Sequence, residues 1–377
     1  SNPGIPMEKF IIKNGKKLRY GYTTGTCAAA ASKAAAFMLF SNKKINQVSI
    51  VTPKGWDLSL DLHNIIIEKD SVACCVIKDA GDDPDVTNRL EICARVKKAE
   101  NGITITGGKG VGKVTKKGLS IPVGSYAINP VPLKMIRESV SEILPNDCGI
   151  KIEIFVPKGE EVSKKTFNPD LGIVGGISII GTSGIVEPMS EEALKEAIIL
   201  EISILKEEGE KNIIFVPGNY GINFLKKELN LDKIPSVKIS NFVGDMLDKA
   251  CEFGIEKILL VGHIGKLVKV ASGSFNTHSK ITNSRMETLA ANCALIKCDT
   301  RLIKEIMESN TTEEAVDYIL KDGLKDVFNI LAEKISERCT KRTQNKIEVS
   351  CVIYSLKHGL LGMSKNAENM IEGFKVV

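Results

Sequence analysis

Residues 258–266 read ILLVGHIGK, an apolar run that ends in a polar loop with two glycines. The run is short and wholly aliphatic, which is typical of a strand buried on both faces of a parallel sheet. Comparable runs at 213–216 and 237–239 alternate with stretches whose apolar residues recur at helical spacing, as at 316–335. Repeated strand–helix units predict an α/β, Rossmann-like domain with a mostly parallel sheet, which we place at residues 161–377.

The first half of the chain has a different pattern, because its predicted strands outnumber its helices and do not alternate with them. Helices are expected at about 26–40, where alanine is abundant, and at 132–144. This pattern predicts an α+β domain over residues 7–160, and we interpret residues 1–6 as an expression remnant before Met7. The expected strands are the β-branched or alternating runs at 46–52, 57–68, 72–78, 91–97 and 151–156.

The composition excludes several classes of protein. Of the 377 residues, 43% are hydrophobic and 26% are charged, as in globular domains rather than disordered or membrane-embedded chains. A formal net charge of +5 and an aromatic content of 5% argue against nucleic-acid binding. No apolar run reaches about 18 residues, so we expect no membrane span. The ten cysteines form no CxxC pair, so we expect reduced thiols, no protein-bound metal and a cytoplasmic location.

Residues 21–31 read GYTTGTCAAAA, so that three threonine hydroxyls and a glycine directly precede the alanine-rich helix. Free N–H groups at a helix start bind anions, and a glycine allows a ligand to approach the backbone closely. The structural alternative is that Thr26 only caps the helix. On the sequence alone, both interpretations of this turn stay open.

Two further polar stretches also have a functional and a structural interpretation. Residues 78–87 read KDAGDDPDVT, and their four carboxylates suit a divalent cation or a general base, or simply turns. Residues 106–115 read TGGKGVGKVT, which fits a phosphate-binding loop or hairpin turns.

The predicted strands of the second domain are each followed by a polar loop that contains glycine. The carboxyl ends of parallel strands line the ligand crevice of an open α/β sheet, so we expect these loops to converge on one site. His263 stands at a strand end, where catalytic groups gather, and imidazole titrates near neutral pH. His278 lies in a polar stretch further on. The loops are at 181–188, 217–221, 240–244 and 262–266.

Several long motifs, spread from about Leu18 to Met363, resemble one family. They are GYTTGTCAAAA, KDAGDDPDV, AINPVP at 127–132, KKTFNPDLGIVGGISIIGTSGIVEPMS at 164–190, PGNYG at 217–221 and VGHIGKLVKVASGSFNTHSK at 261–280. The chain resembles the CbiD family, the cobalt-precorrin-5B C1-methyltransferases of anaerobic cobalamin biosynthesis. The resemblance implies an enzyme that transfers a methyl group from S-adenosylmethionine to C1 of a cobalt corrinoid, giving cobalt-precorrin-6A. The cobalt is then carried within the substrate.

On this resemblance we assign expected roles to residues. We expect His263, Asp82 and Asp83 to be catalytic, as acid–base or orienting groups. The carboxylates of a corrinoid need cationic and hydrogen-bonding partners, which we expect to be Thr23, Thr24, Gly25, Thr26, Lys165, Lys266, Asn276, His278 and Lys280. We expect S-adenosylmethionine to bind in the second domain, at Gly181, Thr182, Gly184, Glu187, Gly218, Asn219 and Asn241.

Two other functions stay open at this point. A GxGxxG motif at the first helix of the domain would favour a nicotinamide-dependent corrinoid oxidoreductase, and that motif is missing. A non-enzymatic corrinoid carrier would bind the corrinoid without turnover. The expected partner is the cobalt-corrinoid substrate, with no nucleic acid and no membrane. A homo-oligomer and transient contacts with other enzymes of the corrin pathway are compatible with the sequence.

Overall fold

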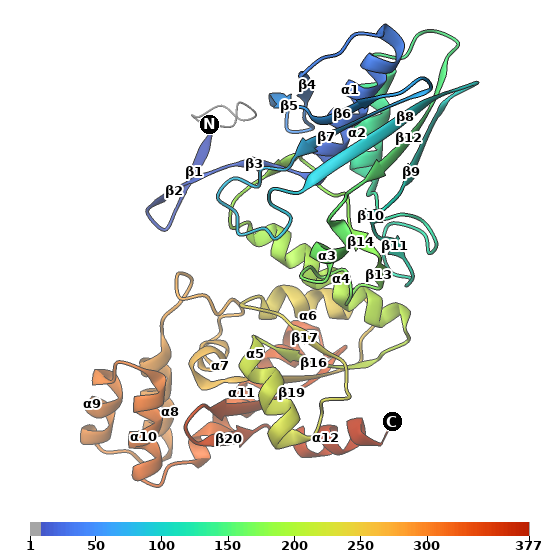
Figure 1. Cartoon of the computed structure of the whole chain (residues 1–377). Coiled ribbons are helices and arrows are strands. Elements are labelled where there is room, and N and C mark those ends of the chain that lie inside the picture. The colour runs from blue at the N-terminus through green and yellow to red at the C-terminus, as the bar shows by residue number, and fades with distance from the viewer. Residues whose placement is uncertain (1–8, 377) are drawn as a thin grey trace. The chain divides into compact units, whose positions relative to one another are not determined.

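The computed structural model describes residues 9–376, so the expected remnant at 1–6 lies outside the described residues. The chain divides into two compact units, Ser1–Leu194 and Lys195–Val377 (Figure 1). The boundary lies later than the expected one after residue 160, because the segment that follows supplies strands to the first unit. These are β13 (Ile173–Val174), which pairs with β11 (Lys113–Val114), β14 (Gly176–Ile177), which pairs with β10 (Gly110–Val111), and β15 (Ile185–Val186), which pairs with β3 (Gly21–Tyr22).

The first unit is built on a mixed five-stranded sheet in the order β6-β7-β8-β12-β9. Neighbouring strands are antiparallel except for β12 and β9, which run parallel. Helices α1 (Thr24–Ser41) and α2 (Pro130–Ser141) pack into the core of this sheet (Figure 1), and the buried alanines of α1 let the helix approach the strands closely. The strands are β6 (His63–Ile67), β7 (Ser71–Ile77), β8 (Glu91–Ala99), β12 (Gly149–Phe155) and β9 (Ile103–Gly107).

Two antiparallel hairpins and a short helix complete the first unit. The combination of a mixed sheet with few helices agrees with the α+β pattern expected from the first half of the sequence. The added elements are the hairpin of β1 (Phe10–Lys13) and β2 (Lys16–Arg19), the hairpin of β4 (Gln47–Val51) and β5 (Asp57–Asp61), and α3 (Gly159–Ser163).

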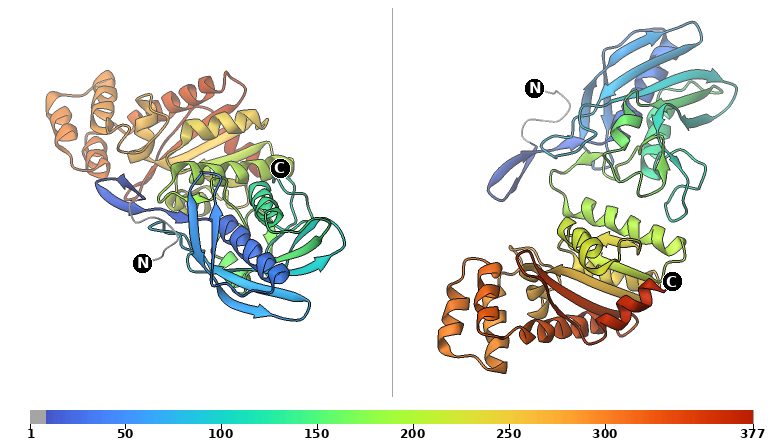
Figure 2. Two further views of the ribbon diagram at one scale, coloured as in Figure 1. Left: turned by 90° about the horizontal axis from the view of Figure 1, so that it is seen from above. Right: turned by 60° about the horizontal axis from the view of Figure 1, so that its bottom comes forward.

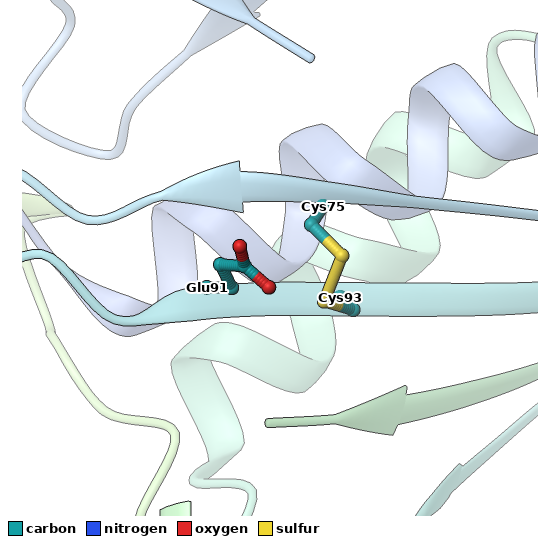
Figure 3. A group of neighbouring side chains, drawn as sticks. All are labelled: Cys75, Glu91 and Cys93. Carbon is teal, nitrogen blue, oxygen red and sulfur yellow. A yellow bond between two sulfur atoms is a disulfide. The ribbon is translucent and has the colours of Figure 1, made fainter. Parts of the chain in front are cut away.

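Strands β7 and β8 are joined by a disulfide between Cys75 and Cys93, which face each other in the register of the two strands (Figure 3). The expectation of reduced thiols is therefore wrong for this pair. The two cysteines are 18 positions apart, and the strand register brings their α-carbons to 4.0 Å. Spacing along the sequence carries no sign of such a register. The other cysteines are free thiols, most of them buried.

Gly110 shows why the stretch at 106–115 contains glycine, because it packs directly against the backbone at residues 156, 159 and 176. At Gly110, where φ is +78°, a Cβ would lie 1.8 Å from the carbonyl oxygen of Val156. At Gly159 and at Gly176, a Cβ would lie 2.1 Å from the carbonyl oxygen of Gly110. Backbones cross here at distances that any side chain would prevent. The stretch therefore serves the close packing of three chain segments, which neither of its two sequence-based interpretations included.

The variant Gly176→Ala should destabilise the first unit by about 3 kcal/mol, because the new Cβ meets rigid backbone on a neighbouring segment. Urea denaturation followed by circular dichroism measures this loss. Gly108→Ala, in the 106–115 stretch, is the matched control, since its Cβ approaches only the movable side chain of Glu153, at 2.9 Å. We expect the control to lose less than about 1 kcal/mol. Equal losses in the two variants would refute the packing interpretation.

The second unit is built on a five-stranded sheet in the order β17-β16-β18-β19-β20. The first four strands are parallel, and β20 runs antiparallel to β19, so the sheet is mostly parallel. Numbered along the chain, the order is 2-1-3-4-5 rather than the 3-2-1-4-5-6 of the Rossmann fold, so the Rossmann-like part of the prediction is not confirmed. The strands are β16 (Asn212–Val216), β17 (Ser236–Lys238), β18 (Lys257–His263), β19 (Glu348–Ser355) and β20 (Gly359–Met363).

Helices cover both faces of this sheet (Figure 2). Alternate residues of β16 belong to separate cores on the two faces, since Ile213 and Phe215 lie in one core and Ile214 and Val216 in the other. The first core contains residues of α4 (Glu191–Glu207), α6 (Val243–Glu252), α7 (Ile264–Ala271), α8 (Arg285–Ile296), α9 (Thr300–Glu308), α10 (Thr312–Lys321) and α11 (Asp326–Arg342). The second core contains residues of α5 (Asn219–Phe224), the π-helix η1 (Leu225–Leu229) and α12 (Ala367–Lys375).

No helix in the described part of the chain combines the length and apolar character that a membrane crossing requires.

Candidate functional site

The carboxyl edge of the second unit's sheet is the place where its topology favours a ligand crevice. Strands β16 and β18 are neighbours, but β16 leads into α5 and β18 leads into α7, on opposite faces of the sheet. Such a reversal is the topological switch point at which open α/β sheets bind ligands. Gly218 and Asn219 follow β16, and His263 ends β18. Three of the expected site residues therefore stand at the carboxyl ends of the two strands that flank the switch point.

The loop after β16 leaves open space beside its backbone. Gly218 has extended backbone geometry, with φ of −168°, and a Cβ built on it would meet no atom within 4 Å. The next two residues are also accessible, since Asn219 is exposed and Tyr220 is 66% exposed. The amide oxygen of Asn219 accepts a hydrogen bond from Lys238 Nζ at 3.2 Å. Nothing in the fold requires glycine at position 218, so this position is free for contact with a ligand.

Both ring nitrogens of His263 have partners inside the chain. The Gly265 N–H donates to Nδ1 at 3.0 Å, so that His263 caps α7. Because Nδ1 accepts this bond, the proton of the neutral ring is on Nε2, which donates to Glu313 Oε1 at 2.7 Å. The imidazole is therefore held in one tautomer and one orientation. This geometry supports an orienting role more directly than a proton-accepting one.

Glu313 is the centre of a small polar network at this edge. Its carboxylate also accepts from Ser355 Oγ at 2.6 Å and from the Leu356 N–H at 2.7 Å. Burial alone would raise the pKa of Glu313, but the hydrogen bonds from Ser355, His263 and this N–H outweigh burial and hold the pKa below its ordinary value. Beside the network, burial raises the pKa of Tyr354 to about 12, so its phenol stays protonated at neutral pH.

No sequence pattern identified Glu313 or Ser355 as site residues. The one related signal was the helix cap at Thr311, whose side chain accepts from the Glu314 N–H. This cap fixes the start of α10 and thereby the position of Glu313. The contacts that matter join residues 50 and 42 positions apart. Long-range contacts of this kind depend on how the helices pack, and no periodicity in the sequence encodes them.

Replacing Glu313 with Gln should lower the free energy of unfolding by about 1 kcal/mol at pH 7, because a neutral amide accepts weaker hydrogen bonds. The pKa of Glu313 lies below its ordinary value of 4.5, so the carboxylate stabilises the fold fully above about pH 4.5 and loses this effect as the pH falls through the folded-state pKa. Urea denaturation at pH 7 and at successively lower pH values should show the difference between wild type and variant shrinking below that point.

The control for this variant is Glu337→Gln, which removes a carboxylate from the exposed side of α11. Glu337 should contribute little at any pH, since exposed charges add little to stability. A difference for Glu313→Gln that stays constant with pH would contradict the network, and so would an equal effect of the control.

The loop between α7 and α8 carries several expected substrate-binding residues, which hold the loop in shape. The amide oxygen of Asn276 accepts from the His278 N–H at 3.0 Å, and His278 Nδ1 accepts from the Lys280 N–H at 3.0 Å. Thr277 Oγ1 donates to Asn241 Oδ1 at 2.9 Å, which ties the loop to the segment after β17. The loop is thus anchored at the carboxyl edge of the sheet, and the side chain of Lys280 is left exposed.

The threonine turn at the start of α1 is buried and bonded within the first unit. Thr23 is the N-cap, because its hydroxyl accepts from the Thr26 N–H at 3.2 Å. The Thr26 hydroxyl donates to the Gly184 carbonyl at 2.8 Å, and Thr24 Oγ1 accepts from the Ile180 N–H at 2.9 Å. The capping interpretation is therefore right in kind, but the cap is Thr23 rather than Thr26.

The four expected S-adenosylmethionine-binding residues between 181 and 187 belong to the first unit. A Cβ at Gly181 would lie 2.4 Å from Thr23, and one at Gly184 would lie 2.8 Å from the Thr26 hydroxyl. Glu187 forms an ion pair with Lys13, at 3.6 Å. Their expected place in the second domain is therefore wrong. Gly181, Thr182, Gly184 and Glu187 lie in the same unit as Thr23–Thr26, whereas Gly218, Asn219 and Asn241 lie in the other.

The aspartates of the 78–87 loop are all bonded within the first unit. Asp79 forms a paired interaction with the Arg19 guanidinium at 2.8 and 3.0 Å, and Asp82 accepts from the Arg19 N–H at 2.6 Å. Asp83 accepts from a backbone N–H at 2.9 Å. Asp85 bonds to Lys78 Nζ at 2.6 Å, and this contact helps hold the pKa of Asp85 down against burial. These bonds support the turn interpretation, although Asp82 stays exposed to solvent.

One group of possible metal ligands occurs among the described residues, namely Cys75, Glu91 and Cys93, whose ligand atoms lie within 4.8 Å of one another (Figure 3). The two sulfurs are bonded to each other in the disulfide and therefore offer no thiolate.

Lys165 is exposed on the first unit. Two hollows of about 280 and 370 Å³, one near Glu228 and one near Met38, include none of the expected site residues.

Comparison with known proteins identifies the family. The family model described as CbiD matches residues 11–188, and that of the CbiD C-terminal domain matches residues 276–365. A relative from Alkaliphilus metalliredigens, named Cobalt-precorrin-5B C(1)-methyltransferase, is 52% identical over 98% of this chain and 98% of its own length. The chain belongs to the CbiD family.

Further relatives carry the same name. The protein from Thermoanaerobacter sp. is 51% identical over 94% of this chain and 98% of its own, and the one from Clostridioides difficile is 44% identical over 98% of this chain and 100% of its own. A crystal structure of a cobalamin biosynthesis protein (cbiD) from Archaeoglobus fulgidus is 28% identical, covers 74% of this chain and 87% of that chain, and gives a TM-score of 0.37.

Proposed function

We propose that this chain is the methyltransferase that transfers a methyl group from S-adenosylmethionine to C1 of cobalt-precorrin-5B, giving cobalt-precorrin-6A in cobalamin biosynthesis. The observation that carries the proposal is the 52% identity, over 98% of both chains, to a protein named Cobalt-precorrin-5B C(1)-methyltransferase. That likeness favours methyl transfer over the two functions that the sequence left open, a nicotinamide-dependent oxidoreductase and a non-enzymatic carrier. Cobalt belongs to the substrate in this proposal.

We place S-adenosylmethionine at the switch point of the second unit, at Gly218, Asn219 and Asn241. The open space at Gly218 and the position of all three after parallel strands support this choice. When bound, S-adenosylmethionine supplies a methyl group already activated on a sulfonium. The residues of the chain therefore have to align the two reacting partners and exclude water, which suits a site with no covalent nucleophile. For Gly181, Thr182, Gly184 and Glu187 we propose a structural role in the first unit.

The proposed corrinoid carries many carboxylates, and exposed or half-buried lysines suit them. We keep Lys165, Lys266 and Lys280 as their partners. We assign His263 to orienting the ligand from its fixed position, and we keep Asp82 as a proton acceptor because its side chain is open to solvent. Asp83 uses one carboxylate oxygen to accept the hydrogen bond from the backbone N–H described above, so we keep its other oxygen as a second proton acceptor.

We also propose a cytoplasmic location, as expected for a cysteine pattern without CxxC or paired spacing. A reducing compartment would convert the disulfide between Cys75 and Cys93 into two thiols. Neither cysteine of this pair, in β7 and β8 of the first unit, is among the residues to which we assign a ligand. The proposed chemistry assigns no role to this pair in either state.

Anaerobic incubation of the protein with methyl-labelled S-adenosylmethionine and cobalt-precorrin-5B, followed by mass analysis, tests the proposal. We expect the corrinoid product to carry one labelled methyl group at C1. The variant Gly218→Val should raise the KM for S-adenosylmethionine by about tenfold or more, because the branched side chain would fill the space left for the ligand. Its melting temperature should equal that of the wild type, since no atom of the fold lies within 4 Å of the new Cβ.

Two results would contradict the proposal. Binding of the corrinoid with no labelled product would support the carrier, and oxidation or reduction of the corrinoid that requires a nicotinamide cofactor would support the oxidoreductase. An unchanged KM in Gly218→Val would leave the reaction standing but remove S-adenosylmethionine from the end of β16.

A further inference from the structure

Three cationic side chains gather where α7 meets α8 in the second unit. Lys266 and Lys269 are three residues apart on α7, so they lie on one side of the helix, and Arg285 is the first residue of α8. Lys269 is only 6% exposed, and Lys266 and Arg285 are half-buried. Burial of a lysine to this extent is unusual unless its charge is paired.

The hydrogen-bonding capacity of these cations is largely unused. Lys269 Nζ donates to the Thr277 carbonyl at 2.9 Å, which satisfies one of its three N–H groups. The Nε of Arg285 is buried and has no hydrogen-bond partner. Among residues 9–376, the structure pairs none of the three side chains with a carboxylate, and Lys266 makes no side-chain hydrogen bond there. Buried donors without partners call for an explanation.

The electrostatics of the cluster are unfavourable as it stands. Burial lowers the pKa of Lys266. Burial also lowers the pKa of Lys269, and the neighbouring charges of Arg285 and Lys266 lower it further. Three like charges held together without a counter-charge oppose folding, and one or two carboxylates among them would relieve this cost. The cluster therefore matches an anion in both charge and hydrogen bonding.

The cluster lies beside the ligand edge of the sheet. Helix α7 begins directly at the end of β18. The Thr277 carbonyl that holds Lys269 belongs to a residue whose N–H donates to the Asn241 carbonyl at 3.0 Å, and Asn241 follows β17. The start of α7 and Asn241 both follow the carboxyl ends of parallel strands, where ligands of open α/β sheets bind.

We propose that Lys266, Lys269 and Arg285 form a receptor for peripheral carboxylates of the corrinoid, with the Arg285 guanidinium and the two ammonium groups as hydrogen-bond donors. The nature of the anion rests on the proposed function, which supplies a ligand with several carboxylates. Arg285 and Lys269 thereby join the substrate-binding residues, and Arg285 provides the planar donor geometry that pairs best with a carboxylate.

The test uses two stable cobalt corrinoids with the same type of ring: cobyrinic acid, whose peripheral groups are carboxylic acids, and cobinamide, in which they are amides. Calorimetry on the full-length protein should show that the wild type binds cobyrinic acid more tightly than cobinamide. In Lys266→Met and in Arg285→Gln, the Kd for cobyrinic acid should rise by about tenfold, the effect of one lost charged hydrogen bond, while the Kd for cobinamide stays the same.

The matched control is Lys304→Met, which removes an exposed lysine from α9. It changes the net charge equally and should leave both affinities unchanged. Lys269→Met should have the largest effect, and its melting temperature shows whether the buried position still folds. Lys266 has no partner in the described fold, so Lys266→Met keeps the test valid if Lys269→Met does not fold.

Three results would overturn the receptor. They are no binding of cobyrinic acid by the wild type, equal affinity of the wild type for both corrinoids, and an unchanged Kd for cobyrinic acid in both Lys266→Met and Arg285→Gln. Failure of the proposed function looks different: the wild type would transfer no methyl group and would still prefer cobyrinic acid, with that preference lost in the two variants.

Discussion

Two threonine hydroxyls hold residues 178–184 against the start of α1, and the rest of the first unit is arranged around this contact. Thr24 and Thr26 are buried, and each bonds to the backbone of that segment. The Gly25 N–H adds a bond to the Ile180 carbonyl at 3.0 Å, and a Cβ at Gly25 would lie 2.7 Å from the ring of Pro132. A helix start that looks ready for an anion is thus occupied by the chain itself.

The same junction draws together the motifs that carry the family resemblance in the first unit. The Tyr22 N–H donates to the Asp79 carbonyl at 2.8 Å, which brings in the aspartate loop, and the Asn129 N–H donates to the Ile179 carbonyl at 2.9 Å, which brings in the 127–132 motif. The polar groups here are satisfied within the unit. At the α7–α8 junction of the second unit, in contrast, cations are buried with unused donors. The two units therefore differ in what they leave for a ligand.

The parts of this structure that depend on local pattern could be predicted from the sequence. The aliphatic run at 258–261 lies within β18, and the alanine-rich stretch expected at 26–40 lies within α1. The parts that depend on distant pairing could not. The domain boundary was placed too early because two-residue strands such as β15 show no periodicity, and the Cys75–Cys93 disulfide depends on strand register. His263 was found from its place at a strand end, but its partner Glu313 was not, because helix packing brings them together.

Hydrogen–deuterium exchange on the free protein tests whether the threonine turn is a structural junction or an open anion site. We expect the hydrogen-bonded amides of this junction, those of Gly25, Cys27, Ile179 and Ile180, to be protected in the absence of any ligand, to the same degree as the β7 and β8 amides, because they open only when the first unit unfolds. We also expect S-adenosylmethionine or a corrinoid to leave this protection unchanged. Rapid exchange of the Ile179 and Ile180 amides in the free protein, with protection appearing only when a ligand is added, would contradict the structural junction.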